Sequence, residues 1–282
     1  MKKIFLFLAL SAGLVKAQNN NNHVVLISVD GLRPEFYMNP EWSMVNVRQM
    51  MKKGAYAQGV RGSFPTVTYP SHTTIVTGVL PSKHGIYYNT PVQPLGITGE
   101  WFWFYKDIKV PTIFSVAKDA GLTTAGVSWP VTVGAPITYN LPEYVYLPKN
   151  KGEKKDEVKA MSMESTPKEL FQEVEDYAVG KFGEYGASLD YAVTDQNKAR
   201  MAAYIFKKYK PSFLALHIAA TDHFEHEEGR DGDKVRSAVA GADVAIKTLI
   251  DAATAAGISE NTTFIITGDH GLWIFTLSLI LM

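Results

Sequence analysis

The strongest strand signal in this 282-residue chain is HVVLISVDG at residues 23–31, an unbroken apolar run followed by an aspartate and a glycine. A β-branched run without polar alternation predicts a strand buried on both faces. Similar apolar runs occupy residues 123–128, 213–218 and 262–267, and the segments between them are long enough to hold helices. This alternation predicts an α/β fold with a mainly parallel central sheet and helices on both faces.

Two long amphipathic helices are predicted beside the later strands. Residues 231–256 carry apolar side chains at steps of three and four, and Gly257 follows as a C-terminal cap. A second helix is predicted over residues 190–209, with Pro211 ending it. The Lys/Glu-rich segment 149–166 predicts an exposed insertion or loop within the same domain.

The overall composition narrows the classes of function. Lys and Arg together number 28 and so do Asp and Glu, so no charge excess favours a nucleic-acid duplex or an acidic membrane. The chain has no cysteine, which excludes disulfides and thiolate chemistry. Any bound metal must therefore use oxygen and imidazole ligands.

The two ends of the sequence differ from the globular part. Two lysines precede a short apolar stretch at the start, and residues 15–17 have the small-x-Ala form of a cleavage site. We expect residues 1–17 to be a removed signal peptide and the protein to be exported, periplasmic or extracellular; an uncleaved anchor or a buried first helix is the alternative. Residues 18–271 are expected to form one catalytic domain. Residues 272–282 form an aberrant apolar tail, too short for stable membrane insertion.

Acidic and imidazole residues follow three of the four predicted strands. Asp30 follows the first run, Asp222 and His226 follow the third, and Asp269 with His270 follows the fourth. Each group alone could be a turn or a solvated loop. Because the ends of parallel strands meet at one edge of a sheet, where ligands bind, the three together predict a metal site. Mixed oxygen and imidazole ligands favour zinc, with manganese or iron as alternatives.

A threonine lies where it could act with such metals. In SFPTVTYPSHTTIVTG, residues 63–78, Pro70 can occupy the first turn of a helix, so that Thr68 lies just before the helix N-terminus. Unpaired amides and the helix dipole favour a phosphoryl group there; the alternative, favoured when Thr68 is considered alone, is that it only caps the helix. A threonine hydroxyl is a weak nucleophile unless a base or metal activates it.

The acidic and imidazole residues at the strand ends could hold two metal ions. Asp30, Asp269 and His270 can supply a metal beside the threonine, and Asp222 with His226 can supply a second that activates water. Two such ions about 4 Å apart would clamp phosphorus from opposite sides.

Taken together, these residues resemble the nucleotide pyrophosphatase/phosphodiesterase family of the alkaline phosphatase superfamily. The motifs that carry the resemblance are Val29-Asp30-Gly31, the segment Thr68 to His72, Thr77-Gly78, His84-Gly85-Ile86, Asn89, Trp129-Pro130, the Asp222 to His226 spacing, and the segment Gly268 to Gly271. The resemblance implies an alkaline phosphatase-like fold and a small-molecule phosphodiester or nucleotide substrate.

The resemblance also implies roles for single residues. Thr68 would be the covalent nucleophile, Asn89 would hold a phosphoryl oxygen, and Tyr69 with Trp129 would lie near the leaving group, although a core-packing role for Trp129 fits equally. Two zinc ions are implied. The first would be surrounded by Asp30, Thr68, Asp269 and His270, and the second by Asp222, His226 and a later histidine.

The sequence departs from this pattern after Gly271, because no histidine follows His270. We therefore expect an incomplete fold at the C-terminus, a weakened second zinc site and impaired activity. The alternatives are a phosphate monoesterase on the same scaffold and a non-catalytic, truncated metal or nucleotide binder. A monoesterase usually adds a cationic pair, for which the sequence offers no assured candidate. A sulfatase is disfavoured because it needs a modifiable cysteine or serine motif.

Overall fold

A computed structural model describes residues 22–94, 96, 98–147, 156–185 and 191–272. The predicted signal peptide and almost all of the apolar tail lie outside the described residues. Among the helices that are described, none combines the length and the apolarity needed to cross a bilayer.

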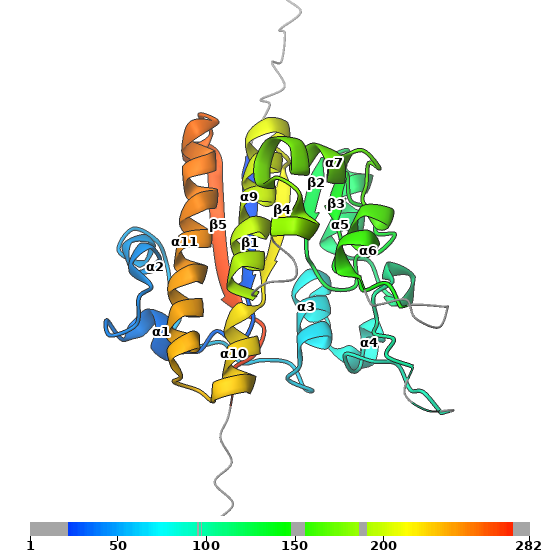
Figure 1. The fold of residues 1–282 in the computed structure, drawn as a ribbon, viewed down its shortest axis with the longest axis horizontal. Coiled ribbons are helices and arrows are strands. Elements are labelled where there is room, and N and C mark those ends of the chain that lie inside the picture. Colours follow the sequence, from blue (N-terminus) through cyan, green and yellow to red (C-terminus); the bar gives the residue numbers. More distant parts are fainter. Residues whose placement is uncertain (1–21, 95, 97, 148–155, 186–190, 273–282) are drawn as a thin grey trace, which may run out of the picture.

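A five-stranded parallel sheet forms the centre of the protein (Figure 1). Its order is β3-β2-β4-β1-β5. The strands are β1 His23–Val29, β2 Thr124–Val127, β3 Tyr139–Leu141, β4 Phe213–Ile218 and β5 Thr262–Gly268. Four of them confirm the predicted runs within a residue or two. Strand β3 was not predicted, because three residues at a sheet edge carry too little hydrophobic pattern to be recognised.

Helices pack on both faces of the sheet, as predicted. Alternate residues of β1 point in opposite directions: Val25 and Ile27 join the larger core with α9 and α11, whereas Leu26 joins a second core with residues of α3 and α5. Helices α9 and α11 run alongside the strands in Figure 1. The helices on the first face are α9 Tyr191–Tyr209, α10 Ala220–Glu228 and α11 Asp233–Ala255; those on the second face are α3 Thr68–Thr77 and α5 Ile113–Asp119.

Shorter elements complete the described part of the chain. They are α1 Pro34–Met38, α2 Val45–Met51, α4 Pro81–His84, α6 Glu157–Glu164, α7 Leu170–Val174, α8 Phe182–Tyr185, and the helical turns Tyr105–Asp107, Glu175–Val179 and Ser259–Asn261.

The charged segment 149–166 is not the simple exposed loop that was predicted. Its second half forms α6, which begins where the Asp156 side chain accepts a hydrogen bond from the Lys159 amide at 2.8 Å. Ala160 and Met161 of this helix are buried. Because Lys and Glu dominate this segment, its apolar face was not recognised in the sequence. That face is enough to pack a two-turn helix against the rest of the protein.

Candidate active site

The predicted metal-binding residues meet at one edge of the sheet. Val29 pairs with both Ile218 and Gly268, so β1, β4 and β5 end at the same level. The residues that follow these ends include Asp30 and Asp269, and α10 begins directly after β4. Strand register alone thus brings together segments far apart in the sequence.

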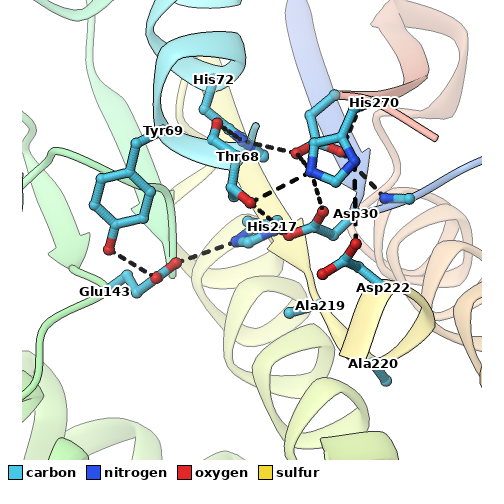
Figure 2. A network of polar contacts seen from close by, with 12 residues as sticks. Asp30, Thr68, Tyr69, His72, Glu143, His217, Ala219, Ala220, Asp222 and His270 are labelled. Carbon is cyan, nitrogen blue, oxygen red and sulfur yellow. Dashed lines mark hydrogen bonds and ion pairs between the residues drawn. The ribbon is translucent and has the colours of Figure 1, made fainter. Parts of the chain in front are cut away.

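Three side chains at this edge have ligand atoms within 4.8 Å of one another: Asp30, Asp222 and His270. His270 Nε2 lies 3.3 Å from Asp30 Oδ1 and 3.3 Å from Asp269 Oδ2, and its Nδ1 lies 4.0 Å from Asp222 Oδ1 (Figure 2). Four of the six predicted metal-binding residues therefore converge. Asp269 also accepts the backbone amides of Gly31 and of its neighbour His270 through Oδ1.

The oxygen atoms of this cluster are poorly satisfied. Asp30 Oδ1, Asp222 Oδ1 and Asp269 Oδ2 are buried and form no hydrogen bond within the described part of the chain. Burial, together with the charge of Asp269, raises the pKa of Asp30 well above its ordinary value, and burial also raises the pKa of Asp222. Buried carboxylates that each keep one oxygen without a hydrogen bond fit a bound cation, which would bind those oxygens and favour the ionised forms.

Thr68 lies beside this cluster as the first residue of α3. Its Oγ1 is 3.5 Å from Asp30 Oδ2 and 3.5 Å from His270 Nε2. Both distances exceed those of strong hydrogen bonds, so the hydroxyl is placed between the two groups without being tied to either. The Thr68 side chain does not cap the helix: the cap residue is Val67, which makes no side-chain cap hydrogen bond.

One glycine and one aspartate side chain hold this arrangement in place. Gly31 has φ +71°, and a Cβ there would lie 2.6 Å from Glu225 Oε2 and 3.2 Å from Asp222 Cα. Asp195 of α9 accepts the amides of Ala219 and Ala220 at 2.7–3.2 Å. It thereby supplies the N-terminal cap that α10 lacks from its own sequence, and fixes the helix that carries Asp222.

A buried polar chain that sequence reasoning missed runs through His217 (Figure 2). His217 Nε2 lies 3.1 Å from Asp30 Oδ2, and its Nδ1 lies 3.2 Å from Glu143 Oε2. The Tyr69 hydroxyl donates to Glu143 Oε1 at 2.8 Å. Burial alone would lower the pKa of His217, but the two carboxylates outweigh it and raise this pKa to about 10. The imidazole is therefore cationic and links both acids.

The sequence contained only a weak indication that His217 belongs to the site. It is the one polar side chain inside the apolar run of β4, and it points to the α3 face, where its ring lies 4.4 Å from that of His72. Burial lowers the pKa of His72 to about 4, so this second imidazole is neutral, and its Nδ1 donates to the Thr68 carbonyl. Glu143 carried no recognisable sequence signal, because it lies in a loop after an unpredicted strand.

The remaining predicted residues are placed as follows. His226 lies one helical turn after Asp222 with Nε2 3.4 Å from Asp222 Oδ2, and its side chain is 66% exposed. Asn89 accepts the Tyr69 amide at 2.9 Å through Oδ1, which leaves its amide nitrogen available to donate. Trp129 is fully buried and packs edge-on against His72. The ring belongs to the second core cluster, as the core-packing alternative expects, and the predicted place near a leaving group stays a prediction.

Comparisons with known proteins match this chain to one family over most of its length. Residues 24–273 match the family described as Type I phosphodiesterase / nucleotide pyrophosphatase. An uncharacterized pyrophosphatase/phosphodiesterase of Schizosaccharomyces pombe is 24% identical over 96% of this chain and 50% of its own length. Ectonucleotide pyrophosphatase/phosphodiesterase family member 1 of Homo sapiens is 32% identical over 38% of this chain and 12% of its own length.

Solved structures of other proteins have a fold similar to that of this chain. Murine ectonucleotide pyrophosphatase / phosphodiesterase 5, in an inactive form in complex with AMP, aligns with a TM-score of 0.61 and 20% identity, covering 89% of this chain and 57% of that one. Phosphonoacetate hydrolase from Sinorhizobium meliloti 1021 aligns with a TM-score of 0.59 and 18% identity, covering 89% and 56%. The chain thus spans little more than half the length of these structures.

Proposed function

This chain belongs to the type I phosphodiesterase/nucleotide pyrophosphatase family, and from that premise we propose that it hydrolyses phosphodiester or nucleotide pyrophosphate bonds through a phosphothreonine intermediate. The observation that carries the proposal is the position of the Thr68 hydroxyl, at the first residue of α3 and beside Asp30 and His270. A nucleophile, a helix N-terminus and a cluster of metal-binding side chains lie together there.

The proposed first step uses the Thr68 hydroxyl. Its Oγ1 attacks phosphorus while the bond from phosphorus to the leaving oxygen breaks, which leaves the remaining phosphoryl group esterified to the threonine. Asp30 Oδ2, 3.5 Å away, can accept the hydroxyl proton. Water then breaks the phosphothreonine ester from the opposite side and restores the hydroxyl.

The phosphoryl oxygens would be held by α3 and Asn89. The Tyr69 amide already donates to Asn89 and Pro70 has no N–H, so α3 would favour an anion mainly through the dipole of its ten residues. Asn89 is already oriented by the Tyr69 amide, so its side-chain nitrogen can donate to a non-bridging oxygen. Both contacts stabilise negative charge as it develops on phosphorus.

We further propose two zinc ions as the cofactors. Asp30, Asp269 and His270, with Thr68, would hold one, and Asp222 with His226 would contribute to the other. The unpartnered oxygens of the three aspartates support this assignment. When bound, such ions lower the pKa of a hydroxyl or a water and neutralise phosphoryl charge.

The test is hydrolysis by purified protein supplied with zinc. Thymidine 5′-monophosphate p-nitrophenyl ester is compared with p-nitrophenyl phosphate, using the wild type, Thr68→Ala and Thr68→Ser. We expect the diester to be preferred, the alanine variant to lose at least about 10³-fold in rate, and the serine variant to retain part of it. A preference for the monoester would instead support a monoesterase, and zinc binding without turnover of either ester would support a non-catalytic binder.

Trapping the intermediate gives a second readout. Acid quenching during turnover followed by peptide mass spectrometry should find phosphate on Thr68. Full diester hydrolysis by Thr68→Ala, or phosphate on another residue alone, would contradict the proposed nucleophile.

A further inference from the structure

Strand register places His217 next to Asp30. His217 of β4 is the Cα partner of Ser28 in β1, and Asp30 follows Ser28 by two residues. Residues two apart in an extended chain project to the same face of a sheet, so the imidazole and the carboxylate meet on one face. The Asp30 backbone is fixed as well, because its amide donates to the Ile218 carbonyl at 2.8 Å. Only the side-chain torsions of Asp30 remain to be set.

The two oxygens of the Asp30 carboxylate have different neighbours (Figure 2). Oδ2 lies 3.1 Å from His217 Nε2 and 3.5 Å from the Thr68 hydroxyl. Oδ1 lies 3.3 Å from His270 Nε2 and forms no hydrogen bond in the part of the chain that the structure describes. The contact with His217 therefore sets which oxygen faces Thr68 and which faces the metal-binding cluster.

His217 is itself held from its other side. Its Nδ1 lies 3.2 Å from Glu143 Oε2, and the Tyr69 hydroxyl donates to Glu143 Oε1 at 2.8 Å. The side chains of His217 and Asp30 are only 3% and 6% exposed, so water competes little for the hydrogen bond between them. A ring held at both nitrogens presents Nε2 to Asp30 in a fixed direction.

We propose that His217 is a positioning residue for metal binding, which holds the Asp30 carboxylate with Oδ1 free to bind the ion, and that Glu143 holds His217 in turn. The inference rests on the zinc site of the proposed function, because Asp30 needs positioning only as a ligand. It goes beyond that function by assigning roles to two residues outside the metal-binding cluster. Partners that orient a ligand typically change metal affinity by about 10- to 100-fold without touching the ion.

Two amide substitutions separate the two nitrogens of the ring. In His217→Gln the amide nitrogen takes about the place of Nε2 and can donate to Asp30, whereas in His217→Asn it takes about the place of Nδ1 and reaches only Glu143. Both variants lose the same charge, so their difference isolates the hydrogen bond to Asp30. In competition with a chromogenic chelator, which needs no substrate, His217→Asn should bind zinc about 10- to 100-fold more weakly than His217→Gln.

A double-mutant cycle shows whether His217 acts through Asp30. Asp30→Ala removes the ligand itself and should weaken zinc binding. Adding His217→Asn or His217→Gln to Asp30→Ala should then give equal zinc affinities, because the side chain to be positioned is gone. A difference that persists in the Asp30→Ala background would contradict the proposed role.

A second buried histidine on the same sheet provides the matched control. His23 is the first residue of β1, at the opposite end of the strand from Asp30, and its Nδ1 lies 2.8 Å from the Pro211 carbonyl oxygen. His23→Asn and His23→Gln should bind zinc equally well, even where urea unfolding shows that one of them is less stable. Different zinc affinities for these two variants would show that loss of stability alone explains the result at His217.

Glu143 tests the same arrangement at a more accessible position, since its side chain is 27% exposed. Glu143→Gln keeps an oxygen that accepts from His217 Nδ1, so it should bind zinc at least about threefold more tightly than Glu143→Leu, which cannot accept. This pair keeps the inference testable if the His217 variants do not fold.

The outcomes separate the inference from the proposed function. Equal zinc affinity of His217→Asn and His217→Gln would overturn the inference, as would equal affinity of the two Glu143 variants or a wild type that binds no zinc. Diester hydrolysis is measured on the same samples. Absence of hydrolysis together with the expected order of zinc affinities would count against the proposed function and leave the inference intact.

Discussion

Replacing His217 with leucine should destabilise the metal-free protein strongly at neutral pH. The side chain is 3% exposed and separates two carboxylates, Asp30 and Glu143. Leucine has a similar volume but removes the cation that lies between the two acids. With the His217 pKa raised from 6.5 to about 10, linkage assigns to its protonation about 4 kcal/mol of stability at pH 7. That agrees with the roughly 3–5 kcal/mol typical of breaking a buried ion pair.

The pH dependence of this loss has a definite sign. Because the folded pKa of His217 lies above its unfolded value, its contribution is fully present below about pH 6.5 and is lost as the pH rises through about 10. The stability difference between wild type and His217→Leu should therefore be large at pH 6 and 7, and should shrink by pH 10.5.

Urea unfolding in the presence of a chelator measures the effect. A loss of about 4 kcal/mol should lower the urea concentration at the unfolding midpoint by roughly 1 M or more. His223→Leu, the same substitution at a partly exposed histidine, should show no comparable dependence on pH. His217→Gln, which keeps a donor but no charge, should lie between the leucine variant and wild type. A pH-independent difference for His217→Leu would refute the reasoning, because it would reduce His217 to a packing residue.

Three other predictions follow from the same site and core. Asp222→Ala should lower the zinc affinity at least about tenfold, measured by titration and by metal analysis; unchanged affinity and stoichiometry would exclude Asp222 as a ligand. Gly31→Ala should cost about 2 kcal/mol or more in urea unfolding, because strain at positive φ is joined by a clash, whereas Gly78→Ala, at a similar φ with open space around it, should cost only about 1 kcal/mol. Equal losses would show that the close approach does not matter. Trp129→Ala should cost about 3–5 kcal/mol as a core truncation, far more than Trp101→Ala at its half-exposed position; the reverse order would contradict the core assignment.

Much of the fold follows from local sequence patterns. The runs of β1 and β4 were long and mostly apolar, so their burial and parallel pairing could be predicted. Asp30 and Asp269 could be predicted as site residues because each comes directly after a predicted strand. Strand β3 and helix α6 were missed, since one is too short and the other carries too many charges for periodicity to stand out.

The rest of the site depends on contacts that no local pattern encodes. The pairing of His217 with Glu143 joins a strand residue to a loop residue 74 positions away, and only the packed sheet brings them together. Trp129 could not be assigned from sequence either, because an aromatic ring near a strand end fits a core or a pocket equally well. In the structure the ring is fully buried in the second core cluster.

The position of β1 between β4 and β5 has a consequence for biosynthesis. Although β1 is the first strand to leave the ribosome, its ladder partners come late: Val24 pairs with Phe213, and His23 pairs with Thr262. The apolar run of β1 therefore stays unpaired while most of the domain is translated. Contacts this distant in sequence make folding slow and expose the nascent chain to aggregation. Chaperone supply during expression should accordingly limit the yield of native protein more than the strength of the promoter.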